Sequence, residues 1–223
     1  DELDQPGLTY ASAVRSKYPR ARVLSIDTSK AEALPGVVGI LRAEDVPVNQ
    51  VGHLIQDWDV MIAQGDVTRC VGDAIVLVVA EDEATLEKAK KLVKIDYEPL
   101  EPVRSIAEAK AADAPRLHDS FFAFGNTVEL KDNVCQSRHV TRGDAAKALA
   151  ESAFTATQRF TTPFTEHAFL EPECAVAFPY KNGVKVQSTD QGAYDTRKEC
   201  AHMFGWDNEP ERVVVETMLV GAL

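Results

Sequence analysis

The pattern of hydrophobic positions is strongest in the first half of the chain. The run Ala74–Ala80 is apolar at every position, whereas a strand that buried only one face would alternate with polar residues. This strand is therefore expected to be covered on both faces. Asp82 can cap a helix over residues 83–92, in which apolar residues recur at helical spacing. A strand over 93–97 completes a β-α-β unit, and a parallel crossover there would be right-handed.

Shorter elements surround this unit, and then the pattern fades. Pro35-Gly36 ends a helix, because proline and glycine both interrupt helices. Between 113 and 143 neither helical nor strand periodicity persists. A loop of that length is unusual inside one compact domain, so we expect a linker that joins two bodies. The elements predicted before it are strands over 8–15, 22–26 and 37–41 and helices over 29–34 and 105–112.

The second half regains a pattern of short elements. Asp144 can cap a helix over 145–151, and residues 154–162 alternate between polar and apolar, which is typical of a half-exposed strand. Asn182-Gly183 is a strong hairpin signal. The other predicted elements are strands over 174–178, 184–188 and 212–220 and a helix over 195–204.

These elements together predict an α+β protein of two bodies. A chain of 223 residues suffices for one large domain or two small ones. We expect a mixed sheet with covering helices over 1–112, a linker over 113–143 and a second body over 144–223.

Composition and charge exclude several function classes. The net charge of −11 has the wrong sign for neutralising phosphates, so we expect no nucleic-acid partner. No apolar run approaches the ~20 residues that span a bilayer, and the N-terminus lacks the features of a signal peptide. The four cysteines are too widely spaced for an iron–sulfur cluster. A cytoplasmic protein without a membrane partner is expected.

Two groups of side chains suggest metal sites, and neither makes a strong set. Pro172 argues against the continuous helix that would bring His167 and its neighbouring carboxylates to one face. The alternative is a turn whose buried polar groups bond the backbone, and we predict no metal ligands. Cys135 and His139 lack further ligands for zinc. The carboxylates in question are those of Glu166, Glu171 and Glu173.

Several phrases resemble one enzyme family in order and spacing. Residues 162–173 read Thr-Pro-Phe-Thr-Glu-His-Ala-Phe-Leu-Glu-Pro-Glu, and 188–191 read Ser-Thr-Asp-Gln. Both are similar to the molybdenum-binding large subunit of the xanthine dehydrogenase and aldehyde oxidase family. Residues 10–37, 71–80 and 92–100 resemble that family's a/b hammerhead domain, which is a scaffold.

The resemblance implies a fold, a cofactor and partners. It implies a hammerhead-like mixed sheet followed by the first part of an α/β molybdopterin-binding domain. The family's molybdenum, bound by molybdopterin, hydroxylates a purine, another N-heterocycle or an aldehyde with oxygen from water. Electrons then pass to iron–sulfur and FAD subunits or domains. Gln191 matches the glutamine that bonds an oxo ligand of the metal, and Gly221 matches the start of the glycine-rich cofactor loop.

Alternatives remain open at this stage. The phrase Ser-Thr-Asp-Gln contains one more residue than the family's Ser-Thr-Gln, so Gln191 is either the family's glutamine or a surface turn residue, with Thr189 and Asp190 as the next candidates. Because the glycine loop and the base glutamate are not in this sequence, we expect the chain alone to hold no cofactor and to be inactive. A non-enzymatic scaffold for subunit contact is the alternative function. An open edge at 212–220 favours self-association.

Overall fold

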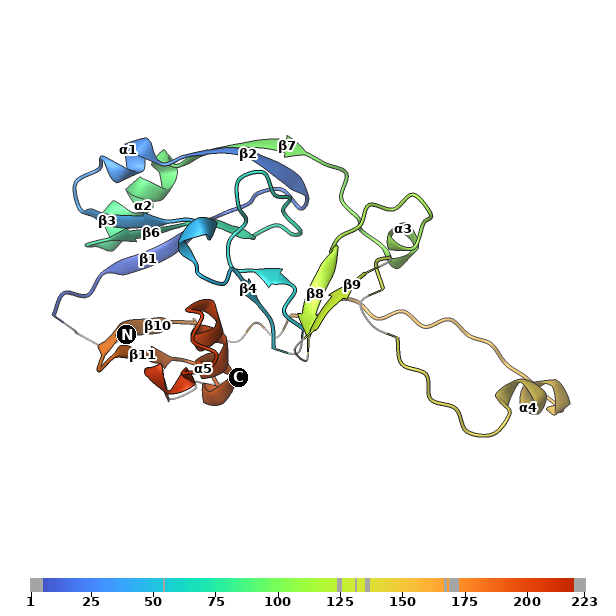
Figure 1. Ribbon diagram of the computed structural model, residues 1–223. Helices are drawn as coiled ribbons and strands as arrows, with labels where there is room; N and C mark the ends of the chain where they lie inside the picture. The colour runs from blue at the N-terminus through green and yellow to red at the C-terminus, as the bar shows by residue number, and fades with distance from the viewer. Residues whose placement is uncertain are drawn as a thin grey trace.

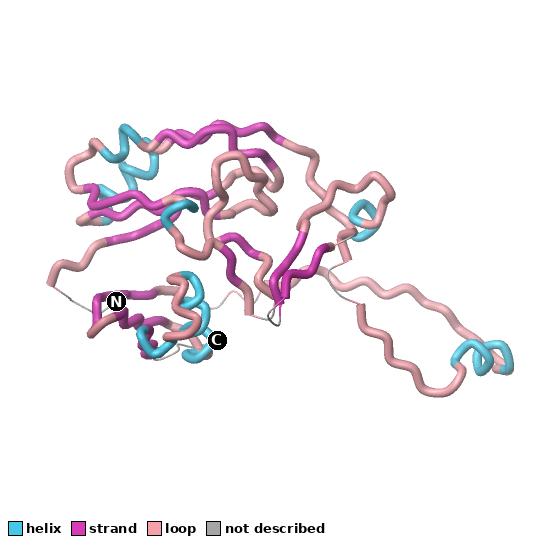
Figure 2. The backbone as a smooth tube through the Cα atoms, in the orientation of Figure 1, coloured by secondary structure: helices cyan, strands magenta, loops and turns pink. Residues whose placement is uncertain are grey.

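The computed structural model describes residues 6–218, except 54, 124–125, 131, 135–136, 167 and 169–172. Within these residues the strands form two three-stranded and three two-stranded sheets, and the protein mixes helices with sheets as predicted (Figures 1 and 2). None of the helices in the described part is long and apolar enough to cross a membrane.

The first sheet has the order β1-β6-β3, with β6 (Ala74–Ala80) in the middle. Its neighbours β1 (Tyr10–Arg15) and β3 (Val37–Leu41) both pair with it in the antiparallel direction. Ile75, Val76 and Val78 are fully buried, and side chains of successive residues in a strand point to opposite faces. The prediction that this strand is covered on both faces is confirmed.

A helix after β6 carries the chain to a second sheet. Helix α2 (Glu83–Leu92) begins at Asp82, whose side chain accepts a hydrogen bond of 2.8 Å from the amide of Thr85. The chain then enters β7 (Lys94–Pro99), which pairs antiparallel with β2 (Ala21–Asp27) and not with β6. The predicted order of strand, helix and strand is confirmed, but β7 does not pair with β6, so a parallel crossover between them does not form.

The core explains this arrangement. Val23 and Ile26 of β2 belong to the same buried cluster as Ile75 of β6 and Leu86 of α2. The apolar side chains of β2 pack in this core over the first sheet. The backbone of β2 needs a partner strand at the same place, and β7 provides it. Figure 1 shows the β2–β7 pair above the β1-β6-β3 sheet, with α2 and the short helix α1 (Ser29–Glu32) at one end.

The segment expected to be a linker contains secondary structure. Strands β8 (Ser120–Ala123) and β9 (Asn126–Glu129) form an antiparallel hairpin that the sequence pattern did not predict. Asn133 ties the segment together, since its Nδ2 donates to the carbonyls of Ala109 and Pro115, each at 3.0 Å. The proposed domain boundaries at 112 and 143 remain a prediction. Also present in the first part are a 3₁₀ turn η1 (Ala43–Asp45), strands β4 (Gln50–Val51) and β5 (Trp58–Asp59) and helix α3 (Ile106–Ala109).

Beyond this hairpin the chain makes a long excursion. Helix α4 (Ala145–Glu151) has the predicted bounds, and Asp144 accepts a hydrogen bond from the amide of Lys147 at 2.9 Å. The strand predicted over 154–162 does not form within the described structure. A strand requires a neighbouring strand to pair with, and Figure 1 shows α4 at the tip of an excursion that stands away from the sheets.

The last sheet has the order β10-β11-β12. Strands β10 (Ala175–Tyr180) and β11 (Gly183–Ser188) form the predicted hairpin. Strand β11 then pairs in parallel with β12 (Val213–Thr217), after the chain has passed through helix α5 (Ala193–Met203) and a 3₁₀ turn η2 (Pro210–Arg212).

Gly183 is not the residue that provides the positive φ of the hairpin turn, although its Asn-Gly sequence suggested this role. The positive φ in the hairpin belongs to Lys181, at 52°, and Gly183 is already paired with Tyr180 in the ladder. A Cβ atom at Gly183 would lie 1.9 Å from the carbonyl oxygen of Arg212. The glycine is therefore needed for the close approach of the backbone that leads into β12.

The close approach predicts a large effect of one methyl group. Gly183→Ala should lower the free energy of unfolding by about 1–3 kcal/mol, as overpacking does, because the Arg212 backbone has to shift. Gly39→Ala is the matched control in β3, where an added Cβ meets no atom within 4 Å. That control should be neutral or stabilising by up to about 1 kcal/mol. Denaturant unfolding of both variants checks this, and equal midpoints would contradict it.

Candidate functional site

The parallel pairing of β11 with β12 creates one edge at which two strands end together. Ser188, the last residue of β11, is in register with Thr217, the last residue of β12. The amide of Met218 donates to the carbonyl of Ser188 at 2.8 Å, which extends the pairing by one step. In open α/β sheets, ligands bind outside the carboxyl ends of the strands. This edge is therefore the candidate functional site.

Asp190 organises the turn that leaves β11. Its carboxylate accepts a hydrogen bond from the Ser188 hydroxyl, one of 2.7 Å from the Gly192 amide and one of 3.1 Å from the Thr196 hydroxyl. These donors, Ser188 first, outweigh its slight burial and hold the pKa of Asp190 below its usual value. Because the pKa in the folded state is lowered, the stabilisation is present at neutral pH and is lost as the pH falls through that pKa.

Gln191 lies between this turn and α5 with an uncommitted side chain. It is exposed, and its carboxamide takes part in none of the hydrogen bonds within the described residues. Asp190 accepts the hydrogen bonds of the turn, whereas the exposed carboxamide of Gln191 is available to a ligand. The sequence places Gly221 three residues after Met218, but Gly221 lies outside the described residues.

Helix α5 is also attached to the first body of the protein. The Val48 amide donates to the Met203 carbonyl at 3.1 Å, and the Gly52 amide donates to Glu199 Oε2 at 3.1 Å. At the N-terminal end of the helix, His53 Nδ1 lies 3.5 Å from Asp195 Oδ1. We call these three contacts the α5 anchor, and they fix the helix that begins two residues after Gln191.

The anchor was not predicted, although part of it is visible in the sequence. Asp195, Glu199 and Met203 are spaced by four residues, so they share one face of a helix. That spacing indicates a helix face that contacts another part of the protein. The loop that supplies the partner, residues 48–53, is far away in the sequence and carries no recognisable motif.

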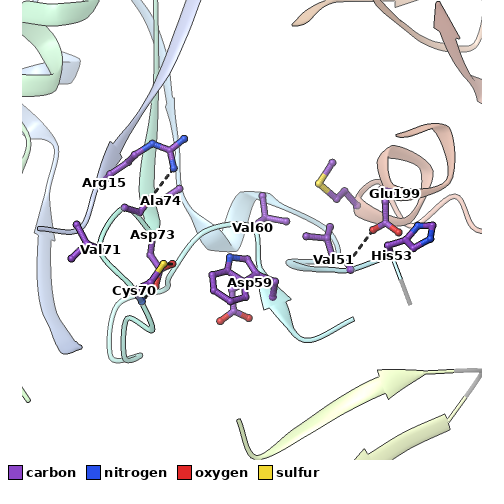
Figure 3. A pocket seen from close by; sticks show the side chains of 14 residues that line it. Arg15, Val51, His53, Asp59, Val60, Cys70, Val71, Asp73, Ala74 and Glu199 are labelled. Atoms are coloured by element: carbon purple, nitrogen blue, oxygen red, sulfur yellow. Dashed lines mark hydrogen bonds between the residues drawn. The ribbon is translucent and has the colours of Figure 1, made fainter. Parts of the chain in front are cut away.

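A cleft of about 830 Å³ lies beside the anchor. Figure 3 shows Glu199 and His53 at one end of it and Cys70 and Asp73 toward the other. Cys70 Sγ donates to Asp73 Oδ1 at 3.0 Å. Burial, together with Asp73, raises the pKa of the Cys70 thiol to about 11. The thiol is therefore protonated at neutral pH and is a poor nucleophile.

The metal ligands considered from the sequence are only partly described. His167, Glu171 and Cys135 lie outside the described residues, whereas Glu166 and Glu173 are exposed. Across the described ranges, no group of three or more His, Cys, Asp or Glu side chains could hold a metal ion.

The α5 anchor predicts a specific loss of protection from hydrogen exchange. Glu199→Ala should speed exchange of the Gly52 amide by roughly fivefold, because a net hydrogen bond contributes about 1 kcal/mol. Glu199→Gln keeps an oxygen acceptor and should retain most of the protection. Lys198→Ala, at the adjacent exposed position, is the control. Unchanged exchange at Gly52 in Glu199→Ala would contradict the anchor.

Comparison with known proteins covers both halves of the chain. The family model described as aldehyde oxidase and xanthine dehydrogenase, a/b hammerhead domain, matches residues 1–101, and the model described as molybdopterin cofactor-binding domain matches residues 127–222. A probable xanthine dehydrogenase subunit of Bacillus subtilis is 31% identical over 219 residues, 97% of this chain and 28% of that protein. The nicotinate dehydrogenase large molybdopterin subunit of Eubacterium barkeri is also 31% identical, over 95% of this chain and 47% of that protein.

Solved structures agree with these matches. Aldehyde oxidoreductase from Desulfovibrio gigas superposes with a TM-score of 0.79 at 24% identity, over 96% of this chain and 23% of that one, which shows the fold. Quinoline 2-oxidoreductase from Pseudomonas putida 86 gives 0.78 at 25% identity, over 99% of this chain and 28% of that one. The chain thus spans less than half the length of each of these four relatives. Both halves match in order, and the chain belongs to the xanthine dehydrogenase and aldehyde oxidase family, of which it spans the hammerhead domain and the start of the molybdopterin-binding domain.

Proposed function

We propose that this chain is part of the large subunit of a molybdenum hydroxylase, which inserts oxygen from water into a C–H bond of an aldehyde, a purine or another N-heterocycle. The observation that carries the proposal is the edge of β11 and β12. There an exposed glutamine with an uncommitted carboxamide follows the carboxyl end of a parallel strand. This edge lies within the residues that match the cofactor-binding model.

The residues at this edge fit a molybdopterin cofactor in two respects. The Gln191 carboxamide has both a donor and an acceptor to offer to an oxygen ligand of the metal. Helix α5 begins two residues after it, and the first amides of a helix favour anionic groups such as the cofactor's phosphate. Bound there, the cofactor would supply the molybdenum centre that takes up electrons from the substrate.

The other residues of the site hold Gln191 in place. Asp190 fixes the turn on both sides of Gln191, because it accepts hydrogen bonds from Ser188 and from two residues after Gln191. The α5 anchor fixes the helix that follows. A catalytic hydrogen bond is effective only when its donor is already oriented in the free protein. The hammerhead body therefore contributes to the site indirectly, through the Glu199–Gly52 contact.

The partners follow from the chemistry. The electrons have to leave the molybdenum centre, and we propose that they pass to iron–sulfur and FAD subunits or domains in the cytoplasm. The names of two relatives, a nicotinate dehydrogenase and a quinoline oxidoreductase, make N-heterocycles a substrate class to test beside aldehydes and xanthine.

Isotope incorporation tests the reaction class. The assembled enzyme should contain molybdenum and should convert xanthine, nicotinate, quinoline or an aromatic aldehyde to a hydroxylated product. In H₂¹⁸O the product should carry ¹⁸O, as mass spectrometry would show. An assembled protein that lacks molybdenum and oxidises none of these compounds would instead support the scaffold function.

Substitution of Gln191 tests the site. In the assembled enzyme Gln191→Ala should lower kcat by on the order of 10²–10³, the effect of removing one preorganised hydrogen bond at a reacting centre. The melting temperature should not change, because the side chain makes no hydrogen bond within the described residues.

Asp190→Ala is the matched comparison at the neighbouring position. It removes three hydrogen bonds from the turn and should lower the melting temperature. An unchanged rate in Gln191→Ala, with loss of activity at an unchanged melting temperature in a variant of Thr189 or Asp190, would move the assignment to that residue.

A further inference from the structure

Residues 137–165, which we call the arm, make no packing contact that hides them from solvent. Every residue in this range is exposed. Phe154 is 94% exposed, Phe160 is 80% exposed and Phe164 is 108% exposed. Burying one such side chain typically contributes about 1.5–3 kcal/mol. Three exposed phenylalanines within eleven successive positions of one segment therefore indicate a surface that another body covers.

The order of the side chains shows how that surface is built. All three phenylalanines occupy even-numbered positions, which they share with Ala156, Gln158 and Thr162. Because successive side chains of a strand point to opposite faces, an extended segment would carry them all on one side. The opposite side would be polar and rich in β-branched residues, which favour strands. It consists of Thr155, Thr157, Arg159 and Thr161.

The backbone of the segment is also without a strand partner. Residues 154–162 belong to no ladder in the described structure, so their amides and carbonyls face water. Pro163 has no amide donor, and a ladder would therefore end beside it. The segment thus has the length, the alternation and the free hydrogen-bonding groups of a strand that adds to the edge of another sheet.

We propose that residues 154–162 dock as a β-strand on the edge of a sheet formed by the remainder of the large subunit, with the phenylalanine face in that sheet's core. This rests on the proposed function only in that the chain is part of a longer subunit. The arm lies inside the match to the cofactor-binding model, at 127–222. Relatives that match nearly the whole chain are about two to four times longer, since the chain spans 47% and 28% of them.

A second copy of this chain is a less suitable partner for residues 154–162 than a sheet of the remaining large subunit. Two arms could pair with each other and satisfy their backbones, but the result is a two-stranded ribbon, which is marginal in water. Both phenylalanine faces would still need a layer to cover them. An edge strand of a larger sheet supplies the backbone partners and the apolar layer at once.

Hydrogen exchange of the wild-type sequence tests the proposal without a variant. The comparison is between the 223-residue chain and the full large subunit encoded by its gene, with residues 154–162 read by mass spectrometry. In the 223-residue chain these amides should exchange at the rate of an unfolded peptide. In the full subunit they should exchange at least ~10²-fold more slowly, as amides in a stable ladder do.

Two variants identify which face of the segment 154–162 is buried in the full subunit. In the full subunit Phe160→Ser should raise exchange across 154–162, whereas Thr157→Ser, on the polar face, should leave it unchanged. If the Phe160→Ser variant fails to fold, the wild-type comparison still decides. Equal, fast exchange in the full subunit would overturn the proposal, as would a gene that ends at Leu223.

Two other outcomes distinguish this proposal from a contact between two copies of the chain and from the proposed function. Protection that appears in the 223-residue chain and grows with concentration, together with a dimer in sedimentation, would assign the arm to a second copy and overturn the proposal. A protected arm in a full subunit that lacks molybdenum and hydroxylase activity would refute the proposed function while supporting the docking strand.

Discussion

The close backbone contact between Gly183 and Arg212 is the constraint on which the site depends. A Cβ atom at Gly183 would lie 1.9 Å from the Arg212 carbonyl oxygen, so only glycine lets the start of β12 lie alongside β11. This approach sets the parallel register from Val184–Val213 to Ser188–Thr217. The same register brings the residues after both strands to one edge, where a ligand can contact them together.

The rest of the molecule holds that edge in a fixed orientation. The buried cluster around Ile75 packs two sheets and α2 together into one core, which is the core of the hammerhead body. From that body the loop at 48–53 extends to α5, and Glu199 accepts the hydrogen bond from the Gly52 amide. Helix α5 is thus held by β12 on one side and by the hammerhead body on the other. A body that is separate from the site can in this way contribute to the precision of the site.

Local signals in the sequence predicted what depends on neighbouring residues. Helices α2 and α4 have the predicted bounds because Asp82 and Asp144 cap them with their own side chains. Predictions failed where a distant partner decides the structure. The choice of β2 as the partner of β7 comes from the shared core, which no local window contains. The segment 154–162 has the alternation of a strand, but none of the described strands pairs with it.

The candidate site also combines features that local sequence indicates with features that depend on distant contacts. The phrase Ser-Thr-Asp-Gln pointed to a turn after β11, but the sequence could not tell which of its residues bonds within the turn and which faces outward. The structure separates them, because Asp190 accepts three hydrogen bonds and Gln191 is exposed. The α5 anchor depends on the meeting of residues 48–53 with α5. Such a contact between segments far apart in the sequence is a property of the fold, so only half of it is visible as helical spacing.

The most direct test of the account is the structure of the cofactor-loaded large subunit. The measured quantity is the distance from the Gln191 carboxamide to the nearest oxygen ligand of molybdenum. We predict a hydrogen bond, at about 2.7–3.2 Å, with Asp190 still bound to the turn. A Gln191 side chain that points into solvent, with the metal at another edge of the fold, would contradict it.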